Sequence, residues 1–179
     1  ALDPHKWLYV PIECGCAFVR DAGRMRDTFS LVPPYLRDDR ALPWFSEFGP
    51  QQTRGFRALK LWLTMQQVGL DGYRALIEHD IQMAEALQAK IRARPDFAPV
   101  AAGPLSVTCF RYAPPGMETA QVDALNRDLL ALVQREGRVF LTSAELDGRF
   151  VLRACIVNFR TREDDLDVLL DTLAEAARR

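Results

Sequence analysis

Residues 3–21 read DPHKWLYVPIECGCAFVRD, which places a lysine between a histidine and a tryptophan and follows them with a long apolar run. Such a run fits either a buried strand or a buried helix, and its periodicity alone does not decide between them. Pro11 and Gly15 disfavour one continuous helix. We therefore expect two short strands within residues 7–20, joined by a turn near residues 13–15.

Lys6 stands out on chemical grounds, because apolar and aromatic residues follow it directly. Loss of solvent disfavours the ammonium form of a lysine and leaves an amine that attacks carbonyl groups. A desolvated amine of this kind is one interpretation of Lys6, and it gains weight only from the family resemblance given below. The residues by themselves favour the other interpretation, in which Lys6 extends from the end of a strand into water and has no chemical role.

Residues 30–52 contain four prolines, at positions 33, 34, 43 and 50, and show no clean helical or strand period. Loops longer than about 15 residues are uncommon inside compact domains and are often functional. We therefore expect a functional loop in this stretch.

The remainder of the chain alternates between helical and strand-like patterns. We expect a small α+β layer, with one sheet and its helices packed on one face. Asp147-Gly148 is typical of a hairpin turn between two antiparallel strands. The expected helices cover residues 21–27 (a single turn), 54–68 (ended by Gly69), 72–92, 117–136 and 162–177, and the expected strands cover residues 105–112, 137–142 and 150–159.

Composition narrows the class of protein. The 179 residues carry 23 Lys+Arg against 24 Asp+Glu, and 49% are hydrophobic, which argues against intrinsic disorder and against a nucleic-acid surface built on net charge. No apolar run approaches the roughly 18 residues of a membrane span. The four cysteines favour reduced, buried thiols in a cytoplasmic protein. Cys14-Gly15-Cys16 is not a CxxC motif, so no metal site is expected.

Asp3-Pro4-His5-Lys6-Trp7 resembles the cofactor-lysine motif of the group II pyridoxal-phosphate-dependent decarboxylases, which include the aromatic-L-amino-acid, histidine, tyrosine and glutamate decarboxylases. Four further segments resemble this family in the same order and at similar spacing: CGCAFVRD (14–21), LVPPYL (31–36), RGFRALKLW (54–62) and FVLRACIV (150–157). The resemblance therefore covers nearly the whole chain.

The resemblance implies an α/β architecture, the fold-type-I fold of pyridoxal-phosphate-dependent transferases. Residues 1–54 would be a remnant of the large cofactor-binding domain, including a mobile catalytic loop at about residues 30–52. Residues 55–179 would form linking helices and the C-terminal small α+β domain.

The resemblance also implies roles for the motif at the start of the chain. Lys6 would hold pyridoxal 5'-phosphate as an internal aldimine, and the cofactor would carry the electron-sink chemistry. His5 would position the lysine, the phosphate or the substrate, or would be a packed, hydrogen-bonded histidine. Asp3 would lie near the cofactor phosphate. Because a carboxylate is a poor phosphate ligand, a backbone or bridging role suits Asp3 better.

Two residues further along receive roles in the same way. Tyr35 corresponds to the loop tyrosine that protonates the substrate carbon after CO2 leaves, because a phenol keeps its proton until a carbanion approaches. Relatives with Phe at this position tend to be aldehyde synthases, so Tyr35 favours simple decarboxylation. The alternative is an exposed tyrosine with no role. Thr53 lies where relatives carry Gly or Ser, and its methyl group would narrow the substrate pocket, an effect of about 1–3 kcal/mol at most.

The expected function is decarboxylation of an L-amino acid, aromatic rather than acidic, to the amine and CO2 by a homodimeric enzyme. An aminotransferase of the same fold, or a non-catalytic dimerisation module, are the alternatives. The lysine motif begins at residue 3 of this chain. In the family, two further active-site residues precede the lysine: an aspartate that pairs with the pyridine nitrogen and a histidine that stacks on the cofactor ring. We therefore expect part of a longer enzyme, inactive by itself.

Overall fold

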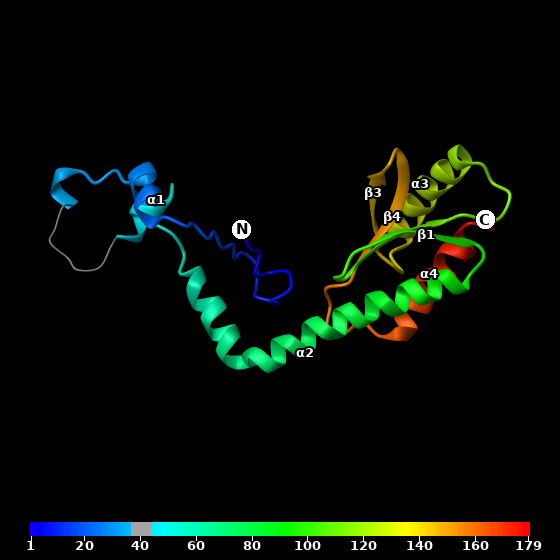
Figure 1. Cartoon of the computed structure of the whole chain (residues 1–179), viewed down its shortest axis with the longest axis horizontal. Coiled ribbons are helices and arrows are strands. Elements are labelled where there is room, and N and C mark those ends of the chain that lie inside the picture. The colour runs from blue at the N-terminus through cyan, green and yellow to red at the C-terminus, as the bar shows by residue number, and fades with distance from the viewer. Residues whose placement is uncertain (37–43) are drawn as a thin grey trace. The chain divides into compact units, whose positions relative to one another are not determined.

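The computed structural model describes residues 1–36 and 44–179 and divides the chain into two compact units, Ala1–Leu70 and Asp71–Arg179 (Figure 1). The sequence placed its boundary earlier, after residue 54. The division lies later because the first turns of helix α2 (Arg57–Ala93) contact the preceding segment, where Arg57 forms an ion pair with Glu13. Gly69, with φ 71° and ψ 171°, interrupts α2 near the division, as its position in the sequence predicted.

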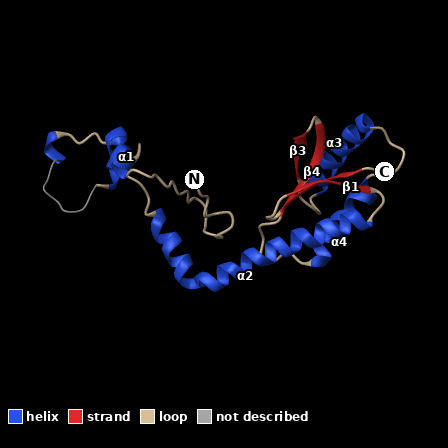
Figure 2. Ribbon diagram, in the orientation of Figure 1, coloured by secondary structure: helices blue, strands red, loops and turns tan. Residues whose placement is uncertain are grey.

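The second unit contains a four-stranded antiparallel sheet in the order β1-β2-β4-β3 (Figure 2). Its strands are β1 (Phe97–Ala102), β2 (Val107–Tyr112), β3 (Thr142–Leu146) and β4 (Arg149–Cys155), and its helices are α3 (Thr119–Glu136), α4 (Glu163–Ala176) and the later part of α2. Asp147 and Gly148 both have positive φ, 51° and 70°, so the β3–β4 hairpin turn is the one that the sequence predicted.

Two expectations about the strands are wrong. The strand expected at residues 137–142 begins only at Thr142, because Gly137, at φ 74°, ends α3 in the left-handed conformation. Strand β1 was missed because it contains Pro99. Since β1 pairs only with β2 and lies at the sheet edge, a residue without a backbone N–H is tolerated there.

One face of the sheet and three helices share the hydrophobic core. Phe110 of β2 faces Leu152 of β4 in register, and both side chains are fully buried. The prediction that the helices pack on one face of one sheet is confirmed, because a single cluster joins the strand residues of that face to all three helices. Its helical members include Ala84, Leu87 and Ile91 of α2, Leu129 and Val133 of α3, and Leu170 and Leu173 of α4.

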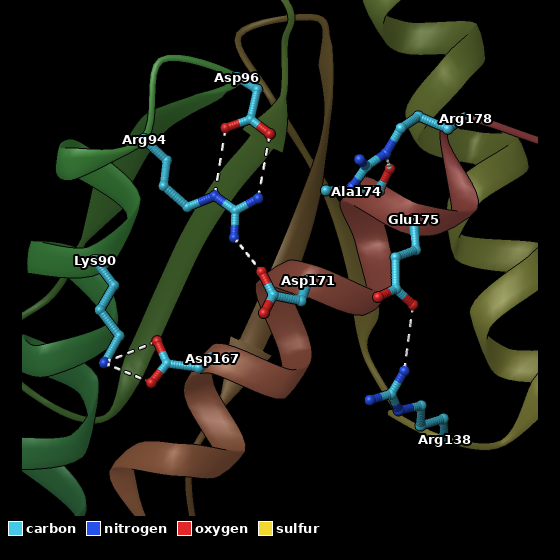
Figure 3. Close-up of polar contacts among 9 residues, drawn as sticks. All are labelled: Lys90, Arg94, Asp96, Arg138, Asp167, Asp171, Ala174, Glu175 and Arg178. Atoms are coloured by element: carbon cyan, nitrogen blue, oxygen red, sulfur yellow. Dashed lines mark hydrogen bonds and ion pairs between the residues drawn. The ribbon is translucent and has the colours of Figure 1, made fainter.

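Polar contacts hold the helices in place around this core. The fully buried Asn126 of α3 accepts a hydrogen bond from the Tyr112 N–H (2.9 Å) and donates to the Tyr112 carbonyl (2.8 Å), which fastens the helix to β2. Figure 3 shows two ion pairs to α4, in which Lys90 of α2 binds Asp167, and Arg94, the residue after α2, binds Asp171 at 2.6 Å. The hydrogen bond from Lys90 to Asp167 raises the pKa of the lysine.

The first unit contains α1 (Ala22–Phe29), the short 3-10 helices η1 (Pro34–Leu36) and η2 (Phe45–Phe48), and the first turns of α2. The helical turn expected at residues 21–27 is confirmed, and Asp21 caps it by accepting from the Gly23 N–H. The two strands expected within residues 7–20 are wrong. There the structure has one isolated bridge, between Leu2 and Cys16, and a strand needs a longer series of paired residues.

Part of the expected loop at residues 30–52 lies outside the described residues, at 37–43. The four cysteines are unpaired thiols, but the expectation that all are buried is wrong. Cys14 and Cys109 are buried, Cys16 is half-buried, and Cys155, at the end of β4, is exposed. Across the described stretches, no helix combines the length and apolar character that crossing a membrane requires.

Candidate functional site

The side chain of Lys6 is held by Asp3 rather than by apolar neighbours. Its Nζ lies 2.6 Å from Asp3 Oδ2, and its backbone N–H donates to the Asp3 carbonyl at 3.0 Å. The lysine side chain is 63% exposed, which agrees with the solvent-exposed interpretation of Lys6 and not with a desolvated amine. The hydrogen bond from Lys6, followed by its positive charge, lowers the pKa of the Asp3 carboxyl. The result is an accessible primary amine paired with an ionised carboxylate.

His5 connects this motif to residues 14–16. Its Nδ1 lies 2.8 Å from the Cys14 carbonyl oxygen, which can only accept, so Nδ1 donates this hydrogen bond and leaves Nε2 as the ring nitrogen that faces away from it. Leu2 and Cys16 exchange two backbone hydrogen bonds, of 2.8 and 2.9 Å. Hydrogen bonds therefore join residues 2–6 to residues 14–16.

An open groove of about 1100 Å³ lies beside that segment. Thr53 lines it, together with residues 13–16, 44–46, 51–52 and 54–58 and Leu61. Arg54 donates to the Phe45 carbonyl at 3.0 Å, and Arg57 is paired with Glu13. Burial raises the pKa of the Cys16 thiol, and the neighbouring Cys14 adds to the effect. Residues 14–16 thus form hydrogen bonds with the segment that contains Lys6, and they also line the groove that Thr53 lines.

Tyr35 lies in η1, and its side chain is 83% exposed. It does not line the groove, and within residues 1–36 and 44–179 no described contact joins it to Asp3, His5, Lys6 or Thr53. The structure therefore brings Asp3, His5 and Lys6 into one local unit, relates that unit to Thr53 through residues 14–16, and leaves Tyr35 apart.

Sequence reasoning missed one polar cluster in this unit. Glu47 of η2 is buried and contacts Arg26 and Ser30. The only signal in the sequence was the spacing of Arg26 and Ser30, four residues apart in a helical segment, because such residues share one face of a helix. Their partner in a proline-rich stretch was not predictable from spacing.

Residues 1–113 match the family described as "Pyridoxal-dependent decarboxylase conserved domain". The chain belongs to this family. The resemblance to pyridoxal-phosphate-dependent decarboxylases that the sequence motifs indicated is thereby confirmed.

Individual relatives agree with this assignment. The chain is 32% identical to an aromatic-L-amino-acid decarboxylase of Bacillus atrophaeus over 92% of its own length and 35% of that protein. It is 30% identical to tryptophan decarboxylase TDC1 of Camptotheca acuminata, over 87% of the chain and 32% of the relative. The chain thus spans about a third of the length of these curated relatives.

The predicted fold class is confirmed by solved structures. The crystal structure of Oryza sativa TDC with PLP and tryptamine matches 98% of this chain and 38% of that chain, with a TM-score of 0.90 and 25% identity. Catharanthus roseus tryptophan decarboxylase in complex with L-tryptophan matches with a TM-score of 0.84, again at 25% identity, covering 98% of this chain and 36% of that one.

Proposed function

We propose that this chain supplies the cofactor lysine and part of the active site of a pyridoxal-phosphate-dependent decarboxylase that converts an aromatic L-amino acid to the amine and CO2. The observation that carries the proposal is the accessible amine of Lys6, paired with Asp3 inside a motif that matches the family. The aromatic preference is supported by the names of the relatives, which include tryptophan and tyrosine decarboxylases.

The residues around Lys6 fit the cofactor. An exposed lysine that a single carboxylate holds is able to condense with an aldehyde, with release of water, once the ion pair opens and the ammonium group loses its proton. Bound pyridoxal phosphate would supply the electron sink for loss of the substrate carboxylate. Asp3 would hold the lysine side chain until the cofactor arrives. His5, with Nδ1 engaged by the Cys14 carbonyl, would present Nε2 for a hydrogen bond with the cofactor or the substrate.

Tyr35 and Thr53 would act on the substrate. In the proposal, the Tyr35 hydroxyl donates its proton to the substrate carbon after CO2 leaves, and its exposure in η1 leaves the phenol accessible for that step. Thr53 lines the groove, and its methyl group would limit the size of the substrate side chain.

The proposed enzyme is a cytoplasmic homodimer in which this chain works as part of a longer protein, and the 179 residues alone are inactive. The support for a longer protein is the fraction of the curated relatives, about a third, that the chain spans.

The chain offers an unusually clean test of the cofactor lysine, because it contains only three lysines, Lys6, Lys60 and Lys90. The chain is incubated with pyridoxal phosphate, reduced with borohydride and mapped by peptide mass spectrometry. We expect the label on Lys6, its loss in Lys6→Ala, and unchanged labelling in the matched control Lys60→Ala. Equal labelling of all three lysines would overturn the assignment of Lys6.

The reaction is tested on the enzyme that contains this chain, loaded with pyridoxal phosphate. L-Tryptophan, L-tyrosine and L-glutamate are offered, and CO2, amine and keto acid are measured. We expect amine and CO2 from the aromatic substrates. Keto acid without CO2 would identify an aminotransferase instead, and no turnover with an intact Lys6 label would favour a non-catalytic module.

A further inference from the structure

Glu47 is a buried carboxylate in the unit of the chain that has few buried side chains. Its side chain is 4% exposed, whereas the neighbouring helix α1 contains no buried residue. Glutamate is almost never fully buried in proteins unless it is paired, because an ionised carboxylate loses its hydration. The burial of Glu47 therefore indicates that specific partners hold it.

Those partners are Arg26 of α1 and Ser30, the residue that caps the C-terminal end of this helix. Arg26 Nη2 donates to Glu47 Oε1 at 3.0 Å, and Arg26 Nε lies 3.0 Å from Oε2, which gives a two-point contact between the guanidinium and the carboxylate. Ser30 Oγ donates to the same Oε1 at 3.0 Å. Ser30 also closes the helix, because its N–H donates to the Arg26 carbonyl at 2.7 Å. We call Arg26, Ser30 and Glu47 the clasp.

The clasp joins two points of the chain that lie on either side of Tyr35. Ser30 precedes the tyrosine, Glu47 follows it, and the two are 17 residues apart in sequence. A second contact holds η2: Arg54, which follows Thr53 in sequence, donates to the carbonyl of Phe45. Arg54, Thr53 and Phe45 all line the groove. The clasp thus fastens one segment of the groove wall to the helix from which the Tyr35 stretch departs.

From this geometry we infer that Glu47 is a positioning residue. By binding Arg26 and Ser30 to η2, it restricts the positions that the Tyr35 side chain can adopt. The catalytic consequence rests on the proposed function, whereas the clasp itself does not. Glu47 would contact neither cofactor nor substrate, and its effect on catalysis would come from the position of Tyr35.

The clasp is tested first in the 179-residue chain by hydrogen exchange of peptides from residues 22–30 and 44–49. In Glu47→Ala and Arg26→Ala we expect exchange in both peptides to become faster by about tenfold or more, because the contacts that oppose local opening are lost. Arg26→Lys keeps the charge but loses the two-point contact, so an intermediate effect is expected.

Arg24→Ala is the matched control. Arg24 lies on the same helix and forms an exposed ion pair with Asp21, without contact to Glu47. Its exchange should equal that of the wild type. Unchanged exchange in Glu47→Ala, or an equal effect in Arg24→Ala, would overturn the clasp whatever the chain catalyses.

The positioning role is tested in the enzyme loaded with pyridoxal phosphate. Glu47→Gln should lower kcat by about tenfold and leave KM within about twofold, because fewer molecules hold Tyr35 in place while substrate binding is intact. In the Tyr35→Phe background the same substitution should have no further effect. Full additivity of the two losses would overturn the positioning role, since a purely structural defect would add to the loss of the phenol.

The two hypotheses fail in different ways. If the wild-type enzyme released no CO2 from any amino acid, the proposed function would fall and so would the catalytic role of Glu47. The exchange experiment would still decide whether the clasp exists.

Discussion

The two units of the chain differ in how much of themselves they bury. In the described part of Ala1–Leu70 the buried side chains are Pro4, Val10, Cys14 and Glu47. Asp71–Arg179 instead has a continuous core of sheet and helix residues, with the fully buried Phe110 and Leu152 facing each other in register.

The candidate functional residues all belong to the unit with few buried side chains. Asp3, His5 and Lys6 lie in a turn that hydrogen bonds and one ion pair hold, whereas Tyr35 lies in a short 3-10 helix and Thr53 in the groove wall. Polar contacts thus position the Lys6 motif, whereas apolar burial stabilises the second unit. Substitutions in the two units should therefore affect different measurements.

The largest expected effect is that of Tyr35→Phe on catalysis. Removing the proton donor should lower the rate of amine formation by about 10²–10⁴-fold, while the free energy of unfolding stays unchanged because the side chain is 83% exposed. Amine formation by the enzyme is followed by chromatography. Leu31→Ala, an exposed neighbour in the same stretch, is the control and should retain the rate.

A core substitution should act only on the second unit. Leu152→Ala removes a fully buried side chain and should cost about 2–5 kcal/mol of unfolding free energy. All three tryptophans, Trp7, Trp44 and Trp62, belong to the first unit, so their fluorescence reports that unit alone. Denaturation followed by far-UV circular dichroism should shift, and the fluorescence transition should not. Equal shifts of both would mean that the two units unfold together.

Loss of the buried amide of Asn126 should have a smaller effect of the same kind. Asn126→Ala leaves the Tyr112 N–H and carbonyl without their partner and should cost about 1–3 kcal/mol. Asn158→Ala, which removes one exposed hydrogen bond to the Arg160 N–H, should cost less than about 0.5 kcal/mol. Urea denaturation of both variants sharpens the comparison between buried and exposed polar contacts.

The smallest effect concerns the ion pair of Asp3 with Lys6. Since the lysine lowers the pKa of Asp3 below its ordinary value of 3.8, the stabilisation from the pair is complete above pH 3.8 and is lost as the pH falls through the lowered pKa. A carbon-13 NMR titration of the Asp3 carboxyl should show this low pKa in the wild type. In Lys6→Ala it should return to the ordinary range, and an unchanged value would contradict the pair.

Local patterns predicted the elements that depend on neighbouring residues. The Asp147-Gly148 turn, the interruption of α2 at Gly69 and the helices α3 and α4 follow from backbone preferences and helical spacing, which act over a few residues. Strand β1 escaped prediction because Pro99 is acceptable only at a sheet edge, and position in a sheet is not a local property.

The sequence by itself determined the family and the identities of the candidate residues, because five ordered segments carry that information. Only the tertiary structure decided their surroundings: that Lys6 is exposed and paired with Asp3, that His5 is tied to Cys14, and that Glu47 is buried against α1. The physical reason is that a residue's solvation and partners depend on which distant segments fold against it. Spacing along the chain does not record that information.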